Sequence, residues 1–367
     1  MIELVAHNPP TQISGIGRYC RELFAHLKDN VDIRMAYPRF PPLSERFTFL
    51  RNFPMGVVGH RTNSLVHFTQ IMGCAQMVWK PLHPAIATVH DLGVLICEDD
   101  QILFNKLDRH ILELQLKGLK QVDLIVADSE FTRRTLIEYL GLSPQRVITV
   151  HLGIDFNRIR SILDSPNTIL DRFPILREIP RPWLLYVGSE LPRKNIRKLL
   201  EILAELRKLL PGVHLIKIGS PGGEKFRTQT YADIQSLGLE RCVLFFNRIV
   251  EKDLYKFYQA ADILVHPSKI EGFGFPVLEA FACGTPVVCS NVGSLPEVAG
   301  GAAIMHSSGE TTSFVESVCR VCNDPLKRKE MAVRGKLQVE KFSWEMTAEK
   351  MKNVYRTVLD ECGLNKR

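Results

Sequence analysis

Residues 263–290 read ILVHPSKIEGFGFPVLEAFACGTPVVCS and hold a complete strand–loop–helix–strand unit. The apolar run at 263–266 predicts a strand, and a polar turn with a glycine loop follows it. Pro276 suits the first position of a helix, Gly284 suits its end, and the apolar run at 286–289 predicts the next strand. A strand, a covering helix and a second strand predict a parallel sheet flanked by helices.

The same alternation of short apolar runs and helical stretches fills most of the chain. Further runs lie at 2–7, 64–69, 85–91, 122–129, 146–153, 183–188, 213–219 and 242–247. The pattern breaks at 171–183, which holds three prolines, and we interpret this stretch as a linker. We therefore expect two doubly wound domains, over residues 1–175 and 176–345, followed by a closing helix within 346–367.

Length and composition indicate a globular protein of about two domains. The 367 residues are 45% hydrophobic and 24% charged, and the net charge of +7 suits a protein that handles anionic ligands. No basic stripe concentrates this charge, so we expect no nucleic acid as a partner. The sequence has neither a recognisable signal peptide nor a long apolar span, so we expect a cytoplasmic protein.

The cysteines and histidines give no pattern of a metal site. Nine cysteines are spread along the chain, several in apolar runs, which indicates buried free thiols in a reducing compartment. Cys319 and Cys322 form a lone C-x-x-C, and no second pair stands at the spacing of a zinc site. His90 and Asp91 form a dipeptide that also occurs in metal phosphohydrolases, but companion ligands are missing. We therefore expect no bound metal ion.

Residues 271–280, EGFGFPVLEA, combine two glutamates with a glycine loop that leads into a helix. Gly272 and Gly274 let the backbone approach a ligand closely, and the helix start offers free N–H groups to a phosphate. Glu279, expected in the first helical turn, could accept both hydroxyls of a ribose, and Glu271 could accept those of a sugar. The alternative is an acid that stabilises a helix start, next to a solvated loop glutamate.

Two further stretches suit the same anionic ligand. Arg193 and Lys194 end the loop after the strand at 183–188, where two cations can neutralise a diphosphate. Residues 14–17, Ser-Gly-Ile-Gly, predict a glycine loop before a helix, and His90 ends a strand. Because ligands of doubly wound sheets bind beyond the strand ends, we expect these residues at one cleft. The alternatives are a charged surface turn and an ordinary tight turn.

These stretches together resemble the retaining glycosyltransferases of family 4. The resemblance rests on the E-x7-E pattern inside HPSKIEGFGFPVLEAFACGTPVVCSNVGSLPEV at 266–298, on YVGSELPRKNI at 186–196 and on Gly-Ile-Gly at 15–17. It covers most of the chain and is strongest over residues 183–300. It implies the α/β fold called GT-B, in which two Rossmann-like domains face each other across a cleft and a C-terminal helix crosses back to the first domain.

The resemblance also implies roles for the matching residues. Glu271 would contact the donor sugar, Glu279 would hold the ribose, and Lys194 would bind phosphate. His90 would lie near the transferred sugar. The positions implied near the sugar and diphosphate are Gly272, Phe273, Gly274 and Phe275. Gly15 and Gly17 would lie in the loop of the first domain, and Arg248 and Ile249 would lie at the base.

One position departs from the family pattern. Many members carry an arginine directly after the glycine that ends the strand at 183–188, whereas this chain has Ser189 there. We expect Arg193, next to Lys194, to supply the missing charge. Both cations would then stabilise the diphosphate that leaves during the reaction, and no metal ion would be needed.

The implied function is the transfer of a hexose, with retention at the anomeric carbon, from a nucleotide diphosphate sugar to a hydroxyl of a glycan or lipid-linked acceptor. The product would be a cell-surface polysaccharide or glycolipid. The sequence PRKN at 192–195 favours GDP-mannose as donor, with a UDP-sugar next, and no cofactor is expected. The alternatives are a nucleotide-sugar epimerase of the same architecture and a non-catalytic protein that binds nucleotide sugars, which Ser189 alone favours.

Residues 34–56 combine basic and aromatic side chains. The four arginines are Arg34, Arg39, Arg46 and Arg51, against a single acid, Glu45, and five aromatic residues interleave with them. Such a segment suits an anionic membrane surface, so we expect a peripheral contact at the inner face of the membrane that would bring a lipid-linked acceptor close. The alternative is an ordinary irregular loop.

Overall fold

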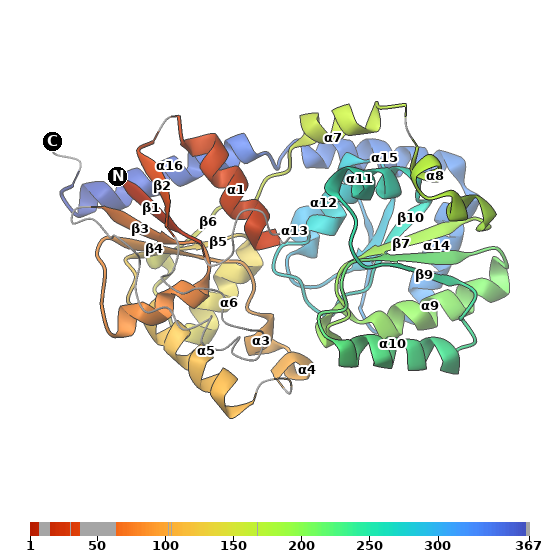
Figure 1. Ribbon diagram of the computed structural model, residues 1–367, viewed down its shortest axis with the longest axis horizontal. Coiled ribbons are helices and arrows are strands. Elements are labelled where there is room, and N and C mark those ends of the chain that lie inside the picture. The colour runs from red at the N-terminus through yellow and green to blue at the C-terminus, as the bar shows by residue number, and fades with distance from the viewer. Residues whose placement is uncertain are drawn as a thin grey trace. The chain divides into compact units, whose positions relative to one another are not determined.

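The computed structural model describes residues 1–6, 15–29, 31–36, 64–101, 103, 105–166 and 168–364. The chain forms two compact units (Figure 1). Unit 1 comprises residues 1–96, 101–153 and 342–367, and unit 2 comprises residues 97–100 and 154–341. The chain thus enters unit 2 after Gly153 and returns to unit 1 at Phe342, and each unit is described separately below.

The proline-containing stretch at 171–183, where the sequence suggests a linker, belongs to unit 2. It contains the end of helix α8 (Ile169–Arg172) and the 3-10 helix η4 (Pro174–Glu178). The Phe173 ring packs against Phe246 and Phe257, with ring centroids 5.3 Å apart in both pairs. These aromatic contacts hold the stretch against unit 2. The boundary between the units therefore lies after Gly153, about twenty residues before the boundary at 175–176 that the prolines suggest.

Unit 1 is built on a parallel sheet of six strands in the order β2-β1-β3-β4-β5-β6. The strands are β1 (Ile2–Val5), β2 (Ile33–Ala36), β3 (Leu65–Phe68), β4 (Ala85–Val89), β5 (Leu124–Ala127) and β6 (Val147–Thr149). Its described helices are α1 (Gly15–Leu27), η2 (Ile71–Val78), α3 (Gly93–Ile96), α5 (Lys106–Leu119), α6 (Glu130–Leu140), η3 (Pro144–Arg146) and α16 (Trp344–Glu361). Helix α4 (Glu98–Gln101) falls at the boundary between the units.

Unit 2 has a second parallel sheet of six strands in the order β12-β11-β10-β7-β8-β9. The strands are β7 (Trp183–Val187), β8 (His214–Ile218), β9 (Val243–Phe246), β10 (Ile263–His266), β11 (Val287–Ser290) and β12 (Ile304–His306). The remaining helices are α7 (Phe156–Leu163), η5 (Pro192–Lys194), α9 (Ile196–Leu209), α10 (Glu224–Ser236), α11 (Glu251–Ala260), α12 (Phe275–Ala282), α13 (Leu295–Ala299), α14 (Thr311–Asn323) and α15 (Pro325–Val339).

The strand order of unit 2 creates a topological switch point. The chain runs outward from β7 to β8 and β9, and then returns to start the other half of the sheet with β10, which pairs directly with β7. In Figure 1, α9 and α10 lie on one side of this sheet and α11 and α12 on the other. Loops that leave β7 and β10 therefore diverge, which leaves room for a ligand beyond these two strand ends.

Apolar residues at helical spacing hold the layers together. Helix α9 buries Leu199, Leu203 and Leu206 against the sheet, where they join one continuous core with strands β7, β8 and β10. Such buried leucines each contribute roughly 1.5–3 kcal/mol to folding. This confirms the prediction of a helix-covered parallel sheet from short apolar runs.

The last helix, α16, packs within unit 1. Ser343 caps its start by accepting a hydrogen bond from the Met346 N–H at 3.2 Å. The buried Tyr355 hydroxyl lies 2.8 Å from Nδ1 of His67, and the Thr347 hydroxyl donates to the carbonyl of His151 at 2.8 Å. The C-terminal helix therefore returns to the first unit, as the sequence predicts.

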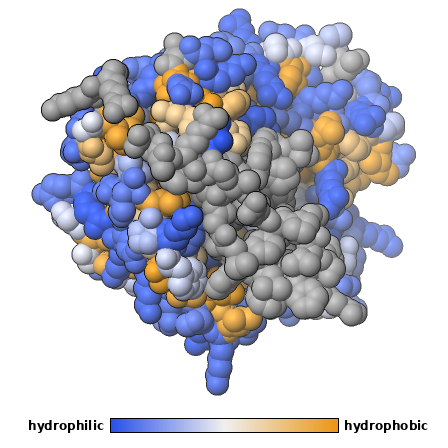
Figure 2. Space-filling model, turned by 60° about the vertical axis from the view of Figure 1, so that its left-hand side comes forward, coloured by the Kyte–Doolittle hydropathy of each residue, from blue (hydrophilic) through white to orange (hydrophobic). Residues whose placement is uncertain are grey.

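The surface of the described residues is mixed. Figure 2 shows mainly hydrophilic side chains, with hydrophobic ones in small separate groups among the coloured atoms. The exposed large hydrophobic residues come from many different elements, among them Trp79, Tyr139, Leu209 and Leu326. In the part of the chain that the structure describes, no helix is both long and apolar enough to span a bilayer.

Candidate active site

The predicted glutamate and lysine meet at the switch point of unit 2. Lys194 ends the short helix η5 in the loop after β7, and Glu271 lies in the loop after β10. Both oxygens of the Glu271 carboxylate accept hydrogen bonds from Nζ of Lys194, each at 2.7 Å. The two residues are 77 positions apart in the sequence, so the pairing of β7 with β10 brings them together.

Two more side chains bind the same carboxylate. Oε1 of Glu271 accepts hydrogen bonds from Nε2 of His266 at 2.7 Å and from the Ser268 hydroxyl at 2.8 Å. His266 is fully buried and stacks on Tyr186, with ring centroids 5.8 Å apart. Its Nδ1 has no hydrogen-bond partner within the described ranges, and since an ionised carboxylate can only accept, Nε2 donates a hydrogen bond to Glu271.

These contacts keep Glu271 ionised although its side chain is buried. Burial alone would raise the pKa of this carboxyl group. The Lys194 charge and the His266 hydrogen bond outweigh burial and hold the pKa well below its ordinary value of 4.5. The site therefore presents a fixed, oriented carboxylate rather than the solvated loop glutamate of the alternative interpretation.

The backbone around Glu271 is held by the turn before α13. The Ser294 hydroxyl donates to the carbonyls of Glu271 at 3.1 Å and Phe273 at 2.7 Å, and the Ser294 N–H also donates to Glu271 at 3.1 Å. Gly293 has φ +59°, and a Cβ atom there would lie 2.4 Å from the Glu271 carbonyl oxygen. Only glycine fits this close approach without displacing the loop.

The glycine loop itself is buried rather than solvated. Gly274 caps α12 with φ +102°, and Phe273 is buried with its ring 5.3 Å from that of Phe275. Gly272 is buried as well. Helix α12 begins at Phe275, so Pro276 is its second residue rather than the first position that the sequence suggests, and the loop brings the N-terminus of α12 next to Glu271.

The second glutamate lies deeper in α12 than the sequence suggests. Helix α12 begins at Phe275, one residue before the proline. Glu279 is four residues beyond this start, so it belongs to the second turn. Its carboxylate is buried, and Oε2 accepts a hydrogen bond from the Tyr258 hydroxyl at 2.9 Å.

The loop after β7 carries the predicted cations. Arg193 precedes Lys194 in η5, and its carbonyl accepts a hydrogen bond from the Lys269 N–H at 2.8 Å. Asn195 takes up φ +57° and donates from Nδ2 to the carbonyls of Pro267 and Ser308. These bonds tie the loop after β7 to the loop after β10. The asparagine tolerates the left-handed conformation better than most residues.

Three other predicted positions lie in loops of unit 2 at the same sheet edge. The carbonyl of Ser189 accepts a hydrogen bond from the Tyr186 hydroxyl at 3.0 Å. Arg248 and Ile249 lie in the loop after β9, one residue beyond its end, with Arg248 exposed and Ile249 half-buried. Since all strands of this sheet are parallel, the loops after β7, β9 and β10 leave from one edge.

The glycines predicted in unit 1 are helical. Gly15 begins α1 and Gly17 lies within its first turn, where Gly17 is buried, so neither forms the loop that the sequence suggests. The loop positions before them, residues 7–14, lie outside the described residues.

His90 follows β4 in unit 1 and is bonded within that unit. Its Nε2 lies 2.9 Å from the carbonyl oxygen of Thr69, which can only accept, so Nε2 carries a proton. Its Nδ1 lies 3.4 Å from Oδ2 of the buried Asp128, and the edge of the Tyr19 ring packs on the imidazole. Burial raises the pKa of Asp128 to about 6, against the lowering effect of the His90 hydrogen bond.

The segment predicted to contact a membrane lies mostly outside the described residues, since residues 37–56 are not described. Arg34 is described, and its guanidinium forms an ion pair with the buried carboxylate of Glu3 on the neighbouring strand. This arginine is therefore engaged within the sheet, and the membrane contact of residues 34–56 stays a prediction.

No three histidine, cysteine, aspartate or glutamate side chains are grouped as a metal ion would require in the described ranges. All nine cysteines are free thiols. Cys319 and Cys322 lie half-buried in α14.

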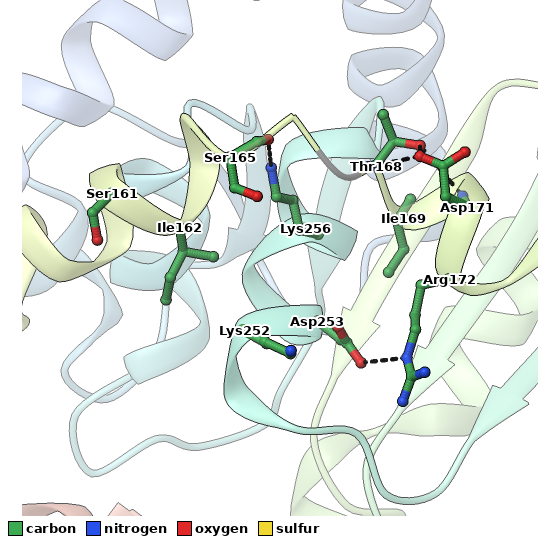
Figure 3. Close-up of a pocket in the computed structure, with 10 residues that line it drawn as sticks. All are labelled: Ser161, Ile162, Ser165, Thr168, Ile169, Asp171, Arg172, Lys252, Asp253 and Lys256. Carbon is green, nitrogen blue, oxygen red and sulfur yellow. Dashed lines mark hydrogen bonds and ion pairs between the residues drawn. The ribbon is translucent and has the colours of Figure 1, made fainter.

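A cavity of about 510 Å³ opens elsewhere in unit 2, between α7, α8 and α11 (Figure 3). Nζ of Lys256 donates to the carbonyls of Leu163 and Ser165 at 2.9 Å, and Nε of Arg172 donates to Asp253 at 3.3 Å. These bonds join the helices that form its walls. None of the predicted site residues lines this cavity, and we assign it a structural origin.

The comparisons with known proteins agree with this architecture. The family model "Glycosyl transferases group 1" matches residues 170–338, and the model "Glycosyltransferase Family 4" matches residues 63–158. The O-antigen chain mannosyltransferase B of Escherichia coli is 30% identical over 286 residues, which cover 75% of this chain and 71% of that protein.

Solved structures share the fold at low sequence identity. Sucrose-phosphate synthase from Thermosynechococcus elongatus superposes with a TM-score of 0.79 and 20% identity, covering 98% of this chain and 99% of that one. The Anabaena protein HepE in complex with UDP-glucose gives a TM-score of 0.72 and 16% identity, with 97% and 99% coverage.

Two doubly wound parallel sheets, a C-terminal helix returned to the first unit and these matches define a glycosyltransferase of the GT-B class. More narrowly, the chain belongs to glycosyltransferase family 4.

The Lys194–Glu271 pair predicts a specific dependence of stability on pH. The folded pKa of Glu271 is depressed, so its contribution to the free energy of unfolding is complete above about pH 5 and is lost as the pH falls below its ordinary value of 4.5. In Lys194→Met, burial dominates and the pKa of Glu271 rises above its ordinary value, so the sign reverses. The variant is less stable than the wild type at pH 7, and this deficit shrinks as the pH falls, because protonation removes the uncompensated buried charge. Calorimetric unfolding between pH 7 and pH 3.5 measures this reversal.

The matched control is Lys208→Met, which removes an exposed lysine paired with the exposed Glu205. Exposed pairs contribute little, so this variant is expected to follow the wild-type pH profile. Identical profiles for Lys194→Met and Lys208→Met would contradict the role of Lys194 as the main counter-charge of Glu271.

Proposed function

We propose that this glycosyltransferase transfers a hexose, with mannose favoured, from a nucleotide diphosphate sugar to a hydroxyl of a glycan or lipid-linked acceptor. The transfer would retain the anomeric configuration, use no metal ion and take place in the cytoplasm. GDP-mannose is the favoured donor and a UDP-sugar is the second choice. The names of the relatives support the choice: one is an O-antigen mannosyltransferase, and HepE was solved with UDP-glucose.

The observation that carries the proposal is the bonded pair of Lys194 and Glu271 at the switch point of unit 2. A nucleotide sugar needs a cation for its diphosphate next to an acceptor of hydrogen bonds for its sugar hydroxyls. The pair supplies both within 3 Å of each other, beside the N-terminus of α12, whose N–H groups and dipole favour an anion.

Each further residue has a place in this proposal. Glu271 would accept hydrogen bonds from the sugar, and Glu279 would hold the ribose with its carboxylate. Lys194 and Arg193 would bind the diphosphate. His90 of unit 1 would act near the transferred sugar. The loop at 248–249 would grip the base through its backbone.

The proposed reaction breaks the bond between the anomeric carbon and the phosphate oxygen, and the electron pair of that bond goes to the diphosphate. Lys194 and Arg193 stabilise the negative charge that grows there. The acceptor oxygen forms the new bond on the side that the diphosphate leaves, and its proton passes to the departing phosphate oxygen. Attack on that side retains the configuration of the sugar.

Thermal unfolding with a panel of nucleotides tests the donor site. GDP or UDP is expected to stabilise the protein, because a ligand at about 100 times its dissociation constant adds roughly 2.7 kcal/mol to the free energy of unfolding. The panel also contains ADP, dTDP and CMP, and the base that stabilises most names the donors for a transfer assay. No stabilisation by any nucleotide diphosphate would overturn the proposal in favour of a chain that has lost its donor site.

A further inference from the structure

A buried ionic cluster lies beside the candidate donor site and was not anticipated from the sequence. Oε1 of Glu190 accepts hydrogen bonds from Nζ of Lys217 at 2.7 Å and from Nη2 of Arg227 at 2.6 Å. The Glu190 and Lys217 side chains are almost completely buried, and that of Arg227 is 12% exposed. The cluster joins the loop after β7, strand β8 and helix α10.

Arg227 is held in one orientation by this cluster. Its Nε donates to both oxygens of Glu190 at 3.0 Å, and its guanidinium lies on the face of the Phe245 ring, 4.3 Å from the ring centroid. A planar guanidinium that is stacked and bonded to a carboxylate through two nitrogens has little freedom to turn. A further hydrogen bond from its Nη2 therefore has a fixed direction.

This bond from Nη2 orients a side chain in the loop after β9. Nη2 of Arg227 donates to Oδ1 of Asn247 at 2.9 Å. Because arginine has donors only, the amide oxygen of Asn247 must face it, and the Nδ2 group is turned the other way. Asn247 is exposed, so Nδ2 is presented to solvent as a hydrogen-bond donor.

Asn247 directly precedes the loop at 248–249, which grips the base in the proposed function. It follows β9 directly and precedes Arg248 and Ile249, and its loop leaves the same sheet edge as the loops of Lys194 and Glu271. A donor group at the base end of the site can pair with an exocyclic carbonyl oxygen. Against an exocyclic amino group it sets two donors against each other.

We propose that Asn247 is a specificity-determining residue that donates from Nδ2 to the keto oxygen O6 of guanine or O4 of uracil in the donor, and that Arg227, fixed by Glu190, is the residue that positions it. The inference rests on the proposed function and narrows it to keto bases. Guanine and uracil nucleotides bind well, whereas their amino counterparts adenine and cytosine bind weakly.

Two comparisons between nucleotides test the proposal, each by calorimetric titration of binding. UDP against CDP exchanges the O4 keto oxygen for an amino group. GDP against ADP exchanges the O6 keto oxygen for an amino group and also removes the N2 amino group of guanine, so IDP, which has O6 without that amino group, is measured beside GDP. In the wild type, the better-binding keto nucleotide is expected to bind about tenfold more tightly than its amino counterpart. The keto oxygen accepts one hydrogen bond from Nδ2, whereas the amino group faces Nδ2 with a second donor. In Asn247→Asp, which turns the exposed donor into an acceptor, that ratio is expected to fall at least fivefold, and in Asn247→Ser it falls less.

The Arg227→Lys variant separates positioning from contact. Lysine lacks the planar fork, so the Asn247 amide is free to turn, and the keto preference is expected to fall although Asn247 is intact. The matched control is Asn353→Asp on α16, since Asn353 is an exposed asparagine whose Oδ1 accepts a hydrogen bond from an arginine, Arg356, at 3.2 Å. Asn353→Asp is expected to leave both ratios unchanged.

The outcomes distinguish a failure of the role proposed for Asn247 from a failure of the donor site itself. A keto-to-amino ratio that stays within twofold of the wild type in Asn247→Asp would overturn the role of Asn247 while leaving the donor site intact. Equal wild-type affinities for GDP and ADP, and for UDP and CDP, would overturn it as well. Binding of none of the four nucleotides would overturn both this inference and the proposed function.

Discussion

Replacing Glu271 with glutamine is expected to lower sugar transfer by at least about a hundredfold, the loss typical of removing one fixed electrostatic contact from an active site. Glutamine keeps the shape of the side chain but removes the charge that Lys194 and His266 orient. Binding of the nucleotide diphosphate alone is expected to persist, because in our proposal Glu271 faces the sugar. The measurement is the release of nucleotide from the donor named by the thermal panel, together with titration of the free diphosphate.

Stability must be separated from activity in this variant. Removal of one partner of a buried ion pair leaves the other charge uncompensated, at a cost of about 3–5 kcal/mol. The double variant Glu271→Gln with Lys194→Met removes both charges, so it is expected to recover much of the lost stability but no activity. Glu205→Gln, which breaks an exposed pair with Lys208, serves as the control and is expected to keep both. Transfer by Glu271→Gln at the wild-type rate would exclude Glu271 from the reaction.

Gly293→Ala is expected to destabilise unit 2 by roughly 3 kcal/mol and to abolish transfer with it. The new Cβ atom would lie 2.4 Å from the carbonyl oxygen of Glu271 and 2.9 Å from its nitrogen, and φ +59° adds the strain of a left-handed residue. Since the obstacle is backbone, the loop that carries Glu271 must move. Chemical denaturation and the transfer assay together measure the effect.

Gly301→Ala is the matched control for this substitution. Gly301 also has a positive φ, +82°, but a Cβ atom there would meet nothing within 4 Å. Its expected cost is the backbone strain alone, about 1 kcal/mol, with transfer preserved. If the two alanine variants lost the same stability and Gly293→Ala stayed active, the contact between this turn and Glu271 would have no importance for the site.

Much of the site could be predicted because its residues follow strands. A polar residue at the end of a parallel strand lies at the ligand-binding edge whatever the details of packing, so Lys194 and Glu271 could both be placed there from the apolar runs before them. The loop predicted at Gly15 and Gly17 of unit 1 was wrong, because both residues lie in α1. Glycine permits a loop but does not require one.

The supporting residues could not be predicted in the same way. His266, Ser268 and Ser294 stand inside the motif run, but their hydrogen bonds to Glu271 depend on the conformation of the loop. Lys217 sits in an apolar strand, and its partner Glu190 is 27 residues away in another loop. A lone charge in such a strand gives no sign of which opposite charge will meet it.

The sequence by itself therefore determined the class of fold, the E-x7-E and PRKN stretches and the strand ends at which they lie. This information is local, since the spacing of apolar residues and the position of glycine and proline govern each element separately. Only the tertiary structure decided that β10 returns to pair with β7, and with it the bonds of Lys194 and His266 to Glu271. The same holds for the orientation of Asn247 through Arg227 and Glu190. These contacts join residues distant in the chain, and their geometry is fixed by the order in which strands assemble and by the need of every buried charge for a partner.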